Sequence, residues 1–212
     1  MYYSKEDIQN TSRVKRLNLI NSVTGVKPAN LIGTISESGV SNLAIFSSVV
    51  HLGSNPALLG FIMRPRHEVR RDTYDNILFS NCFTVNQVHP EFVAKAHYTS
   101  AKFDKDVSEF EKCQLTEEYL PDFPAPFVKE SKLKIGMKFE EAIPIEINNC
   151  LMIVGSIQHL MIDDNLVEEN GQIDLQALNS VGIGGLNRYY TLQSIDKFPY
   201  ARVNELPDFV NS

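Results

Sequence analysis

The sequence is poor in cysteine and contains none of the usual metal-binding patterns. Its three cysteines, Cys82, Cys113 and Cys150, are odd in number, widely spaced and without a CxxC pair. Such cysteines are expected to be reduced thiols rather than parts of a disulfide framework. The five histidines form no HxH or HExxH pair, so we predict no protein-bound metal.

Long hydrophobic runs are also missing. The longest nearly apolar stretch is CLMIVGSIQHLMI, which Ser156, Gln158 and His159 interrupt. It is shorter than the ~20 residues that a membrane-spanning helix needs. The first residues, MYYSKEDIQN, contain no basic region followed by an apolar one, which argues against a secretory signal. We therefore expect no membrane segment and a cytoplasmic protein.

A broad basic surface is absent as well. The formal net charge is −6, whereas a nucleic-acid-binding face needs more cations than one local cluster provides. With 212 residues, of which 43% are hydrophobic, the chain can bury the core of one large domain. We expect an N-terminal arm at residues 1–27, a main domain at 28–200 with a surface excursion at 101–130, and a C-terminal tail at 201–212.

What the sequence does contain is a series of short β-prone segments. Residues 29–36 and 42–52 are apolar and flank a turn around Gly39, which predicts a β-hairpin. Further strands are predicted at residues 57–64, 82–88, 133–147 and 151–162. Helices are predicted at residues 72–81, with Asp72 or Thr73 as the N-cap, and at 90–100. Six or seven mainly antiparallel strands with few helices favour a closed or partly closed barrel.

Four arginines gather in the stretch RPRHEVRRDT, between the third predicted strand and the first predicted helix. Planar guanidinium groups and the free amides at a helix start both suit a phosphate. The candidate anion ligands are Arg64, Arg66, Arg71 and Thr73. The alternative is a solvated loop, in which these side chains pair with Glu68, Asp72 and Asp75; of the four arginines, we expect Arg70 to be merely exposed.

Several stretches, taken in order, resemble the flavin reductase-like family with the FMN-binding split-barrel fold. They are ANLIGTIS, SNLAIFSS, SNPALLGFIMRP, RRDTYDNI, MIVGSIQHLMIDDNLV and GIGGLNRYY, from about Ala29 to Tyr190. The order and spacing of these stretches carry the resemblance, because no single motif among them is specific. The sequence departs from the family pattern at Val50 and His51, where many members have asparagine and a small residue.

The resemblance implies a mainly β fold, a Greek-key antiparallel barrel with flanking helices, and FMN as cofactor. It implies an enzyme that transfers hydride from NAD(P)H to flavin and on to free flavin or another small acceptor. It makes the FMN phosphate the anion that Arg64, Arg66, Arg71 and Thr73 would bind. It places the flavin ring at Ser47, Ser48, Val49 and Val50, although the two serines could simply end a core strand. It also implies a homodimer with flavin at the seam and a monooxygenase as a candidate partner.

No catalytic acid or base is predicted, because the cofactor carries the chemistry of hydride transfer. The segment GIGG lacks the GxGxxG pattern of a dinucleotide-binding fold, so we interpret Gly182, Gly184 and Gly185 as a loop near the active site or the dimer seam. Tyr189 and Tyr190 are expected to be packing residues. Two other function classes stay open: an FMN-binding electron carrier without nicotinamide turnover, and a barrel that binds ligand or nucleic acid without redox chemistry.

Overall fold

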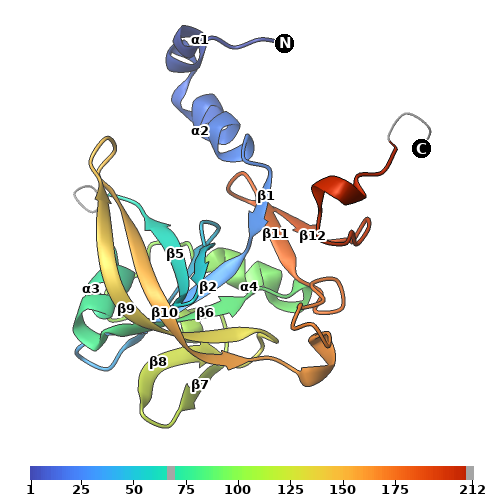
Figure 1. Ribbon diagram of the computed structural model, residues 1–212. Coiled ribbons are helices and arrows are strands. Elements are labelled where there is room, and N and C mark those ends of the chain that lie inside the picture. Colours follow the sequence, from blue (N-terminus) through green and yellow to red (C-terminus); the bar gives the residue numbers. More distant parts are fainter. Residues whose placement is uncertain (66–69, 209–212) are drawn as a thin grey trace.

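The computed structural model describes residues 1–65 and 70–208 (Figure 1). The helices in this part of the chain are α1 (Lys5–Asn10), α2 (Arg13–Ser22), α3 (Asp72–Ser80), α4 (Val93–Tyr98) and α5 (Glu109–Lys112), with short 3₁₀ turns at Pro90–Phe92, Asp164–Leu166 and Val203–Glu205. The strands are β1 (Val26–Pro28), β2 (Asn30–Ile35), β3 (Ser41–Phe46), β4 (Val50–Ser54), β5 (Ala57–Met63), β6 (Cys82–Gln87), β7 (Glu117–Leu120), β8 (Phe123–Val128), β9 (Lys134–Ile145), β10 (Cys150–Met161), β11 (Val181–Gly184) and β12 (Arg188–Thr191). No helix among these is long and apolar enough to cross a membrane.

One seven-stranded sheet forms the body of the molecule, with the strand order β3-β2-β6-β9-β10-β5-β4 and antiparallel pairing throughout. Its two outermost strands, β3 and β4, are joined by residues 47–49 alone. The four Cα–Cα steps from Phe46 to Val50 span at most about 14 Å, so these outer strands lie close together and the sheet must curl into a barrel. The predicted partly closed antiparallel barrel is thus confirmed.

The hairpin predicted around Gly39 is confirmed for β2 and β3, which pair from Asn30 with Phe46 to Ile35 with Ser41. Gly39 has a φ of 80°, a backbone conformation that glycine adopts without steric cost. The prediction of one continuous strand over 42–52 was wrong. The chain leaves β3 after Phe46 and crosses to β4 at the opposite edge of the sheet, because β-prone composition does not reveal which partner a strand will pair with.

The barrel interior is closed by aromatic and aliphatic side chains from several strands. Phe61 is 1% exposed and packs edge-on against Phe46 and Phe83, with ring centroids 4.9 and 5.5 Å away. Met137 and Ile153 complete this cluster from β9 and β10. Burying each side chain of this size contributes roughly 1.5–3 kcal/mol, so this cluster fixes the barrel on which the loops are mounted.

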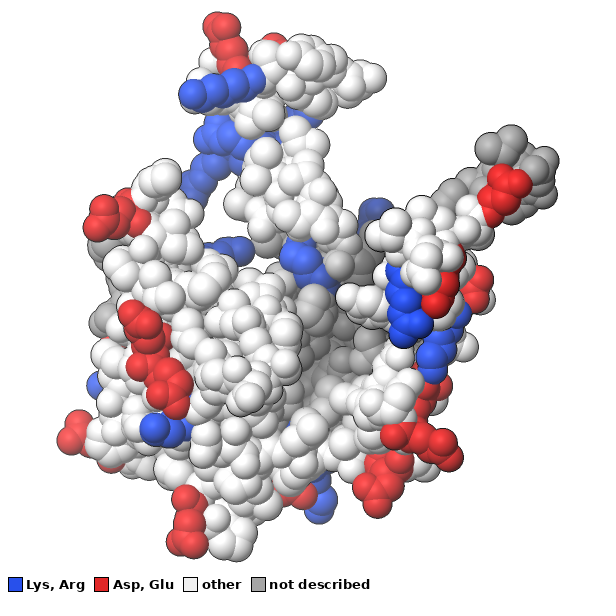
Figure 2. All heavy atoms as spheres, viewed as in Figure 1, with Lys and Arg blue, Asp and Glu red and all other residues white. Residues whose placement is uncertain are grey.

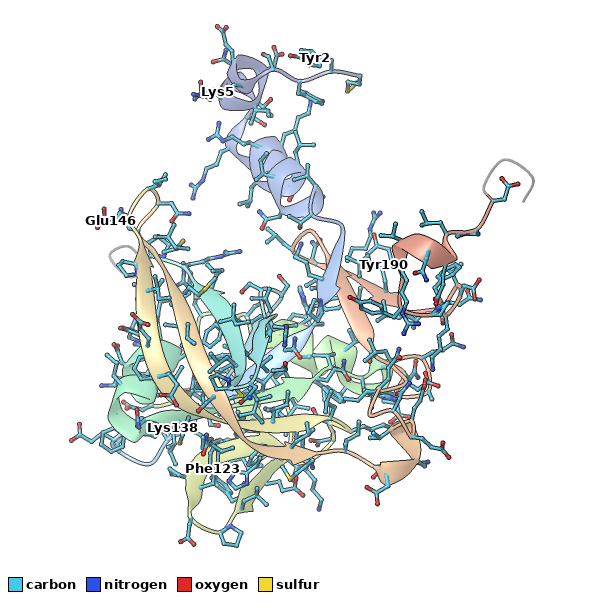
Figure 3. The ribbon with its side chains drawn as sticks, viewed as in Figure 1. Tyr2, Lys5, Phe123, Lys138, Glu146 and Tyr190 are labelled. Carbon is cyan, nitrogen blue, oxygen red and sulfur yellow. The ribbon has the colours of Figure 1, made fainter. Side chains whose placement is uncertain are left out.

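The surface excursion predicted at 101–130 was wrong for its second half. Strand β8 buries Ala125, Phe127 and Val128 completely, and it packs against β2 and β6. Phe123, at the end of the barrel opposite the N-terminal arm (Figure 3), packs edge-on against His159. Three prolines between Leu120 and Phe127 suggested an irregular loop, but β8 pairs only with the short β7, and such an edge position tolerates proline.

The N-terminal arm stands away from the barrel. Helices α1 and α2 contain no buried residue, and Figure 2 shows the arm standing clear of the β9–β10 hairpin. The arm leads into β1, which pairs with β11 in a three-stranded sheet with β12. Glu146 lies at the tip of the β9–β10 hairpin, and Tyr190 projects from β12 on the side of the molecule near the arm (Figure 3).

Candidate functional site

A cleft of about 980 Å³ opens where β3, β5, the start of α3 and the root of the arm meet. Its size falls within the range of about 300–1,000 Å³ that is usual for small-molecule sites. The cleft wall includes Ser47, Ser48, Arg64, Arg71 and Thr73. The fold therefore brings five of the eight predicted site residues to one cavity, although they come from three separate stretches of the chain.

Arg71 is the residue whose surroundings are most unusual. Its Nε atom is buried and has no hydrogen-bond partner, which is a costly arrangement for a polar atom unless a ligand completes it. Arg71 is also the N-cap of α3, and its side chain makes no capping bond. The prediction of Asp72 or Thr73 as N-cap was thus wrong by one or two positions, because helix ends are poorly specified by sequence.

The two arginines in the cleft repel each other. Burial lowers the pKa of the Arg71 guanidinium, and the positive charge of Arg64 lowers it further. Among the residues that the structure describes, no carboxylate forms an ion pair with either arginine. Like charges brought together in this way favour binding of an anion.

Arg70 behaves differently from Arg71. Its Nε lies 2.7 Å from one carboxylate oxygen of Asp72, and its Nη2 donates to the carbonyl oxygen of Phe103. Arg70 also lines the cleft, but the carboxylate of Asp72 neutralises its charge, so the prediction that it is merely exposed was wrong. Arg66 lies outside the described residues, so its predicted role stays a prediction.

The structure places only half of the predicted ring-binding segment in the cleft. Ser47 and Ser48 line the cleft, and the Ser48 hydroxyl accepts a hydrogen bond from Ile62 N at 3.0 Å. Val49 packs against the barrel core, while Val50 is 45% exposed at the start of β4. Neither valine is part of the cleft lining, and neither is His51, which lies exposed on β4.

Two polar residues of the cleft were missed by sequence reasoning. Glu109 is 8% exposed, and its Oε2 accepts hydrogen bonds from Asn42 Nδ2 and Leu43 N, both at 2.9 Å. Asn42 Oδ1 in turn accepts from the Thr73 hydroxyl at 3.2 Å. Asn42 lies inside the quoted stretch SNLAIFSS and could have been found there, whereas nothing near Glu109 in the sequence marks it.

The glycine segment lies near the cleft but is not a loop throughout. Gly182 and Gly184 belong to strand β11, and only Gly185 lies in the following turn, with a φ of 62°. Ile183 and Gly185 line the cleft, so this segment borders the candidate site, and its predicted nearness to an active site or a dimer seam stays a prediction. Tyr189 is a packing residue, as predicted: it contacts a core cluster, and its hydroxyl lies 2.9 Å from His97 Nδ1.

The matched family agrees with this geometry. The family model described as "Flavin reductase like domain" matches residues 26–178. This range includes the barrel and the described cleft lining, apart from three residues of the arm and three at and just after the end of β11. The chain belongs to the flavin reductase-like family. Membership of this family gives the protein a flavin as cofactor and a general oxidoreductase role.

Solved structures place the chain within this family's fold. A protein from Shewanella frigidimarina NCIMB 400, described as a candidate flavin reductase with a split barrel domain, is 47% identical with a TM-score of 0.91, and the match covers 95% of this chain and 100% of that one. Nitrilotriacetate monooxygenase component B from Bacillus cereus is 21% identical with a TM-score of 0.82, covering 93% and 98%. Flavoredoxin of Desulfovibrio vulgaris (Miyazaki F) is 18% identical with a TM-score of 0.73, covering 95% and 98%.

Proposed function

We propose that this protein is an FMN-dependent oxidoreductase that transfers hydride from NAD(P)H to flavin and on to free flavin or another small acceptor. One observation favours FMN over a flavin that lacks a phosphate. Arg71, whose Nε is buried and unpartnered, lines the cleft together with Arg64, and a phosphate monoester carries about −1.5 to −2 charge at neutral pH. A flavin without a phosphate would bring no negative charge to these two guanidinium groups and no partner to Arg71.

The residues of the cleft fit the parts of FMN. Arg64 and Arg71 would hold the phosphate, and the backbone near Ser47 and Ser48, at the point where the chain leaves the sheet, would hold the polar edge of the ring. Ile45, Phe46 and Ile62 also line the cleft and offer an apolar surface to the ring. Bound FMN would supply hydride transfer, and these side chains bind it, orient it and exclude water.

The proposal can be tested by steady-state oxidation of NADH and of NADPH with FMN added to the purified protein. We expect turnover that depends on added flavin, together with a stoichiometric flavin absorbance if FMN is retained. Negligible oxidation of both nicotinamides by protein that carries tight flavin would contradict the reductase function. A colourless protein that fails to bind added FMN would contradict flavin binding itself.

A second candidate function is electron transfer by bound FMN without nicotinamide turnover. The likeness to a flavoredoxin favours it, although that protein is too distant to show more than the fold. The same experiment separates the two functions, because a carrier would hold flavin tightly and still fail to oxidise NADH or NADPH. Reduction by a small artificial electron donor would then show that the bound flavin is active.

The proposed function includes partners. We propose a homodimer with the flavin at its seam, because the root of the arm lines the cleft and the arm helices α1 and α2 bury no residue. The likeness to a monooxygenase component B supports a monooxygenase that receives reduced flavin. A cytoplasmic location would supply both nicotinamide cofactors and keep Cys82, Cys113 and Cys150, which are buried and free, reduced.

A further inference from the structure

The cleft contains a chain of hydrogen bonds that begins at a buried carboxyl group. Glu109 Oε2 accepts from Leu43 N and from Asn42 Nδ2. Because an ionised carboxylate can only accept hydrogen bonds, Glu109 turns the nitrogen end of the Asn42 amide toward itself. The oxygen end of that amide must then point the other way, toward Thr73.

Asn42 Oδ1 is an acceptor for two hydroxyl groups. Thr73 Oγ1 donates to it at 3.2 Å and Thr34 Oγ1 donates at 3.3 Å. Asn76 Nδ2 donates to the same Thr34 hydroxyl at 3.1 Å, which is consistent with Thr34 using its own proton for Asn42. A hydroxyl has one proton, so Thr73 offers lone pairs, and no hydrogen-bond donor, to the cleft that it lines.

A phosphate is a poor partner for such an oxygen. The oxygens of a phosphate dianion accept hydrogen bonds, as does Thr73 Oγ1 in this arrangement, so the two would lack a proton between them. Asp104 and Glu109 line the cleft together with Asn42, and their negative charge disfavours a second anion near them. The sugar-alcohol chain of a flavin, by contrast, carries hydroxyl groups that can donate.

We infer that Thr73 Oγ1 accepts a hydrogen bond from a ribityl hydroxyl of the flavin, and that Asn42 and Glu109 are positioning residues that keep Thr73 in this acceptor role. The inference rests on the proposed binding of FMN. It changes the role predicted for Thr73 from phosphate ligand to ligand of the sugar alcohol, and it leaves the phosphate to Arg64 and Arg71. The site would then recognise two parts of the ligand with two separate groups of residues.

Three ligands separate these roles: FMN, riboflavin without the phosphate, and lumiflavin without the ribityl chain. We expect Thr73→Val to weaken FMN and riboflavin by the same factor, about two- to tenfold for one neutral hydrogen bond, and to leave lumiflavin unchanged. Thr73→Ser keeps the hydroxyl and should bind all three like the unaltered protein. Affinities can be measured by quenching of flavin fluorescence, with thermal unfolding to show that each variant is folded.

The positioning role has its own test. In riboflavin binding, Asn42→Leu should lose about as much affinity as Thr73→Val, and the double variant should lose no more than either single variant, because both changes remove the same contact. Additive losses would show that Asn42 acts independently of Thr73, which overturns the positioning role.

The remaining outcomes are also decisive. A loss confined to FMN in Thr73→Val would make Thr73 a phosphate ligand, and equal losses for all three ligands, or no loss, would remove it from ribityl binding. The proposed function fails in a different way, through Arg71→Gln binding FMN and riboflavin with unchanged relative affinity, or through unaltered protein that binds no flavin.

Discussion

At the scale of single residues, the contrast between Arg70 and Arg71 gives the strongest test of the phosphate site. We expect Arg71→Gln and Arg64→Gln to weaken FMN binding while riboflavin binding hardly changes. A hydrogen bond to a charged group is worth roughly 1.5–3 kcal/mol, which corresponds to about tenfold to somewhat over a hundredfold in affinity. Arg64 is exposed, so its effect should lie near the lower figure.

Arg70→Gln is the matched control for these variants. It removes the same charge from the adjacent position, but Arg70 already pairs with Asp72, so FMN affinity should change little. Comparing FMN with riboflavin also controls for misfolding, which would lower both affinities together. If Arg64→Gln and Arg71→Gln leave the ratio of the two affinities unchanged, the arginines form a solvated cluster and bind no phosphate.

Glu109 should make stability depend on pH. Burial raises the pKa of its carboxyl group from 4.5, and the charge of Asp72 raises it further, while hydrogen bonds from Leu43, Asn42 and the residue's own backbone partly oppose the shift. A carboxyl whose pKa is raised by folding holds its proton more tightly in the folded state. Its contribution to the free energy of unfolding is therefore fully present below about pH 4.5 and is lost as the pH rises through the folded-state pKa.

Urea unfolding of the unaltered protein and of Glu109→Gln at several pH values measures this effect. We expect the stability of the unaltered protein relative to the variant to fall as the pH rises above about 4.5, because the amide side chain of the variant does not titrate. A stability difference that is constant with pH would mean that the pKa of Glu109 is the same in the folded and unfolded states. Asp72 is present in both proteins, so its own titration largely cancels.

At the scale of secondary-structure elements, Gly33 sets how closely β8 approaches β2. A Cβ atom at position 33 would lie 2.3 Å from the carbonyl oxygen of Pro126 and 2.5 Å from Thr84 Oγ1, distances that no unstrained structure allows. We expect Gly33→Ala to destabilise the fold by about 1–3 kcal/mol, the usual cost of overpacking, or more if β8 must separate. Thermal or urea unfolding measures the loss.

Gly53→Ala provides the comparison, because a Cβ there meets only Pro56 O, at 3.3 Å. It should cost much less than Gly33→Ala in the same unfolding experiment. Equal stability of the two variants would mean that β8 can move away from β2 without loss, which its fully buried residues Ala125 and Phe127 do not suggest.

The elements that sequence could predict are those specified by local chemistry. The turn at Gly39, the β9–β10 turn at Asn148 and Asn149, and the helix after Arg71 follow from residues that favour those conformations. The break at Ser47 and the burial of β8 could not be predicted, since both depend on strands far away in the sequence. The same holds for the site: the arginines are visible as a cluster in the sequence, whereas Glu109 becomes a neighbour of Asn42 only when α5 packs against β3.

At the scale of the whole molecule, the N-terminal arm is the feature that supports the proposed dimer. Helix α2 has ten residues and buries none of them, and isolated helices shorter than ~12–15 residues are only marginally stable in water. Val14, Leu17, Ile20 and Val23 are between 44% and 67% exposed on this arm. Packing against a second copy would supply the missing contacts.

Sedimentation velocity at micromolar concentration should therefore show a dimer. We expect Leu17→Glu to weaken the dimer by tenfold or more, since about 1.5 kcal/mol or more of burial is lost. Asn18→Glu, which adds the same charge one position away on the same helix, should have little effect. A flavin-loaded monomer of the unaltered protein at this concentration would rule out the dimer.

The three-residue link between β3 and β4 affects how easily the barrel can open beside the cleft. At this point the barrel is closed by the covalent chain and by one hydrogen bond, from Ile62 N of β5 to the Ser48 hydroxyl. Neighbouring strands elsewhere in the sheet are joined by a ladder of backbone hydrogen bonds. The link is therefore the place where the barrel should open most easily. A ligand lying along Ser47, Ser48 and the start of α3 would connect the two sides of that opening. Its binding should therefore slow amide hydrogen exchange in β3, β4 and β5. Exchange should slow less in the β9–β10 hairpin, which lacks such an opening.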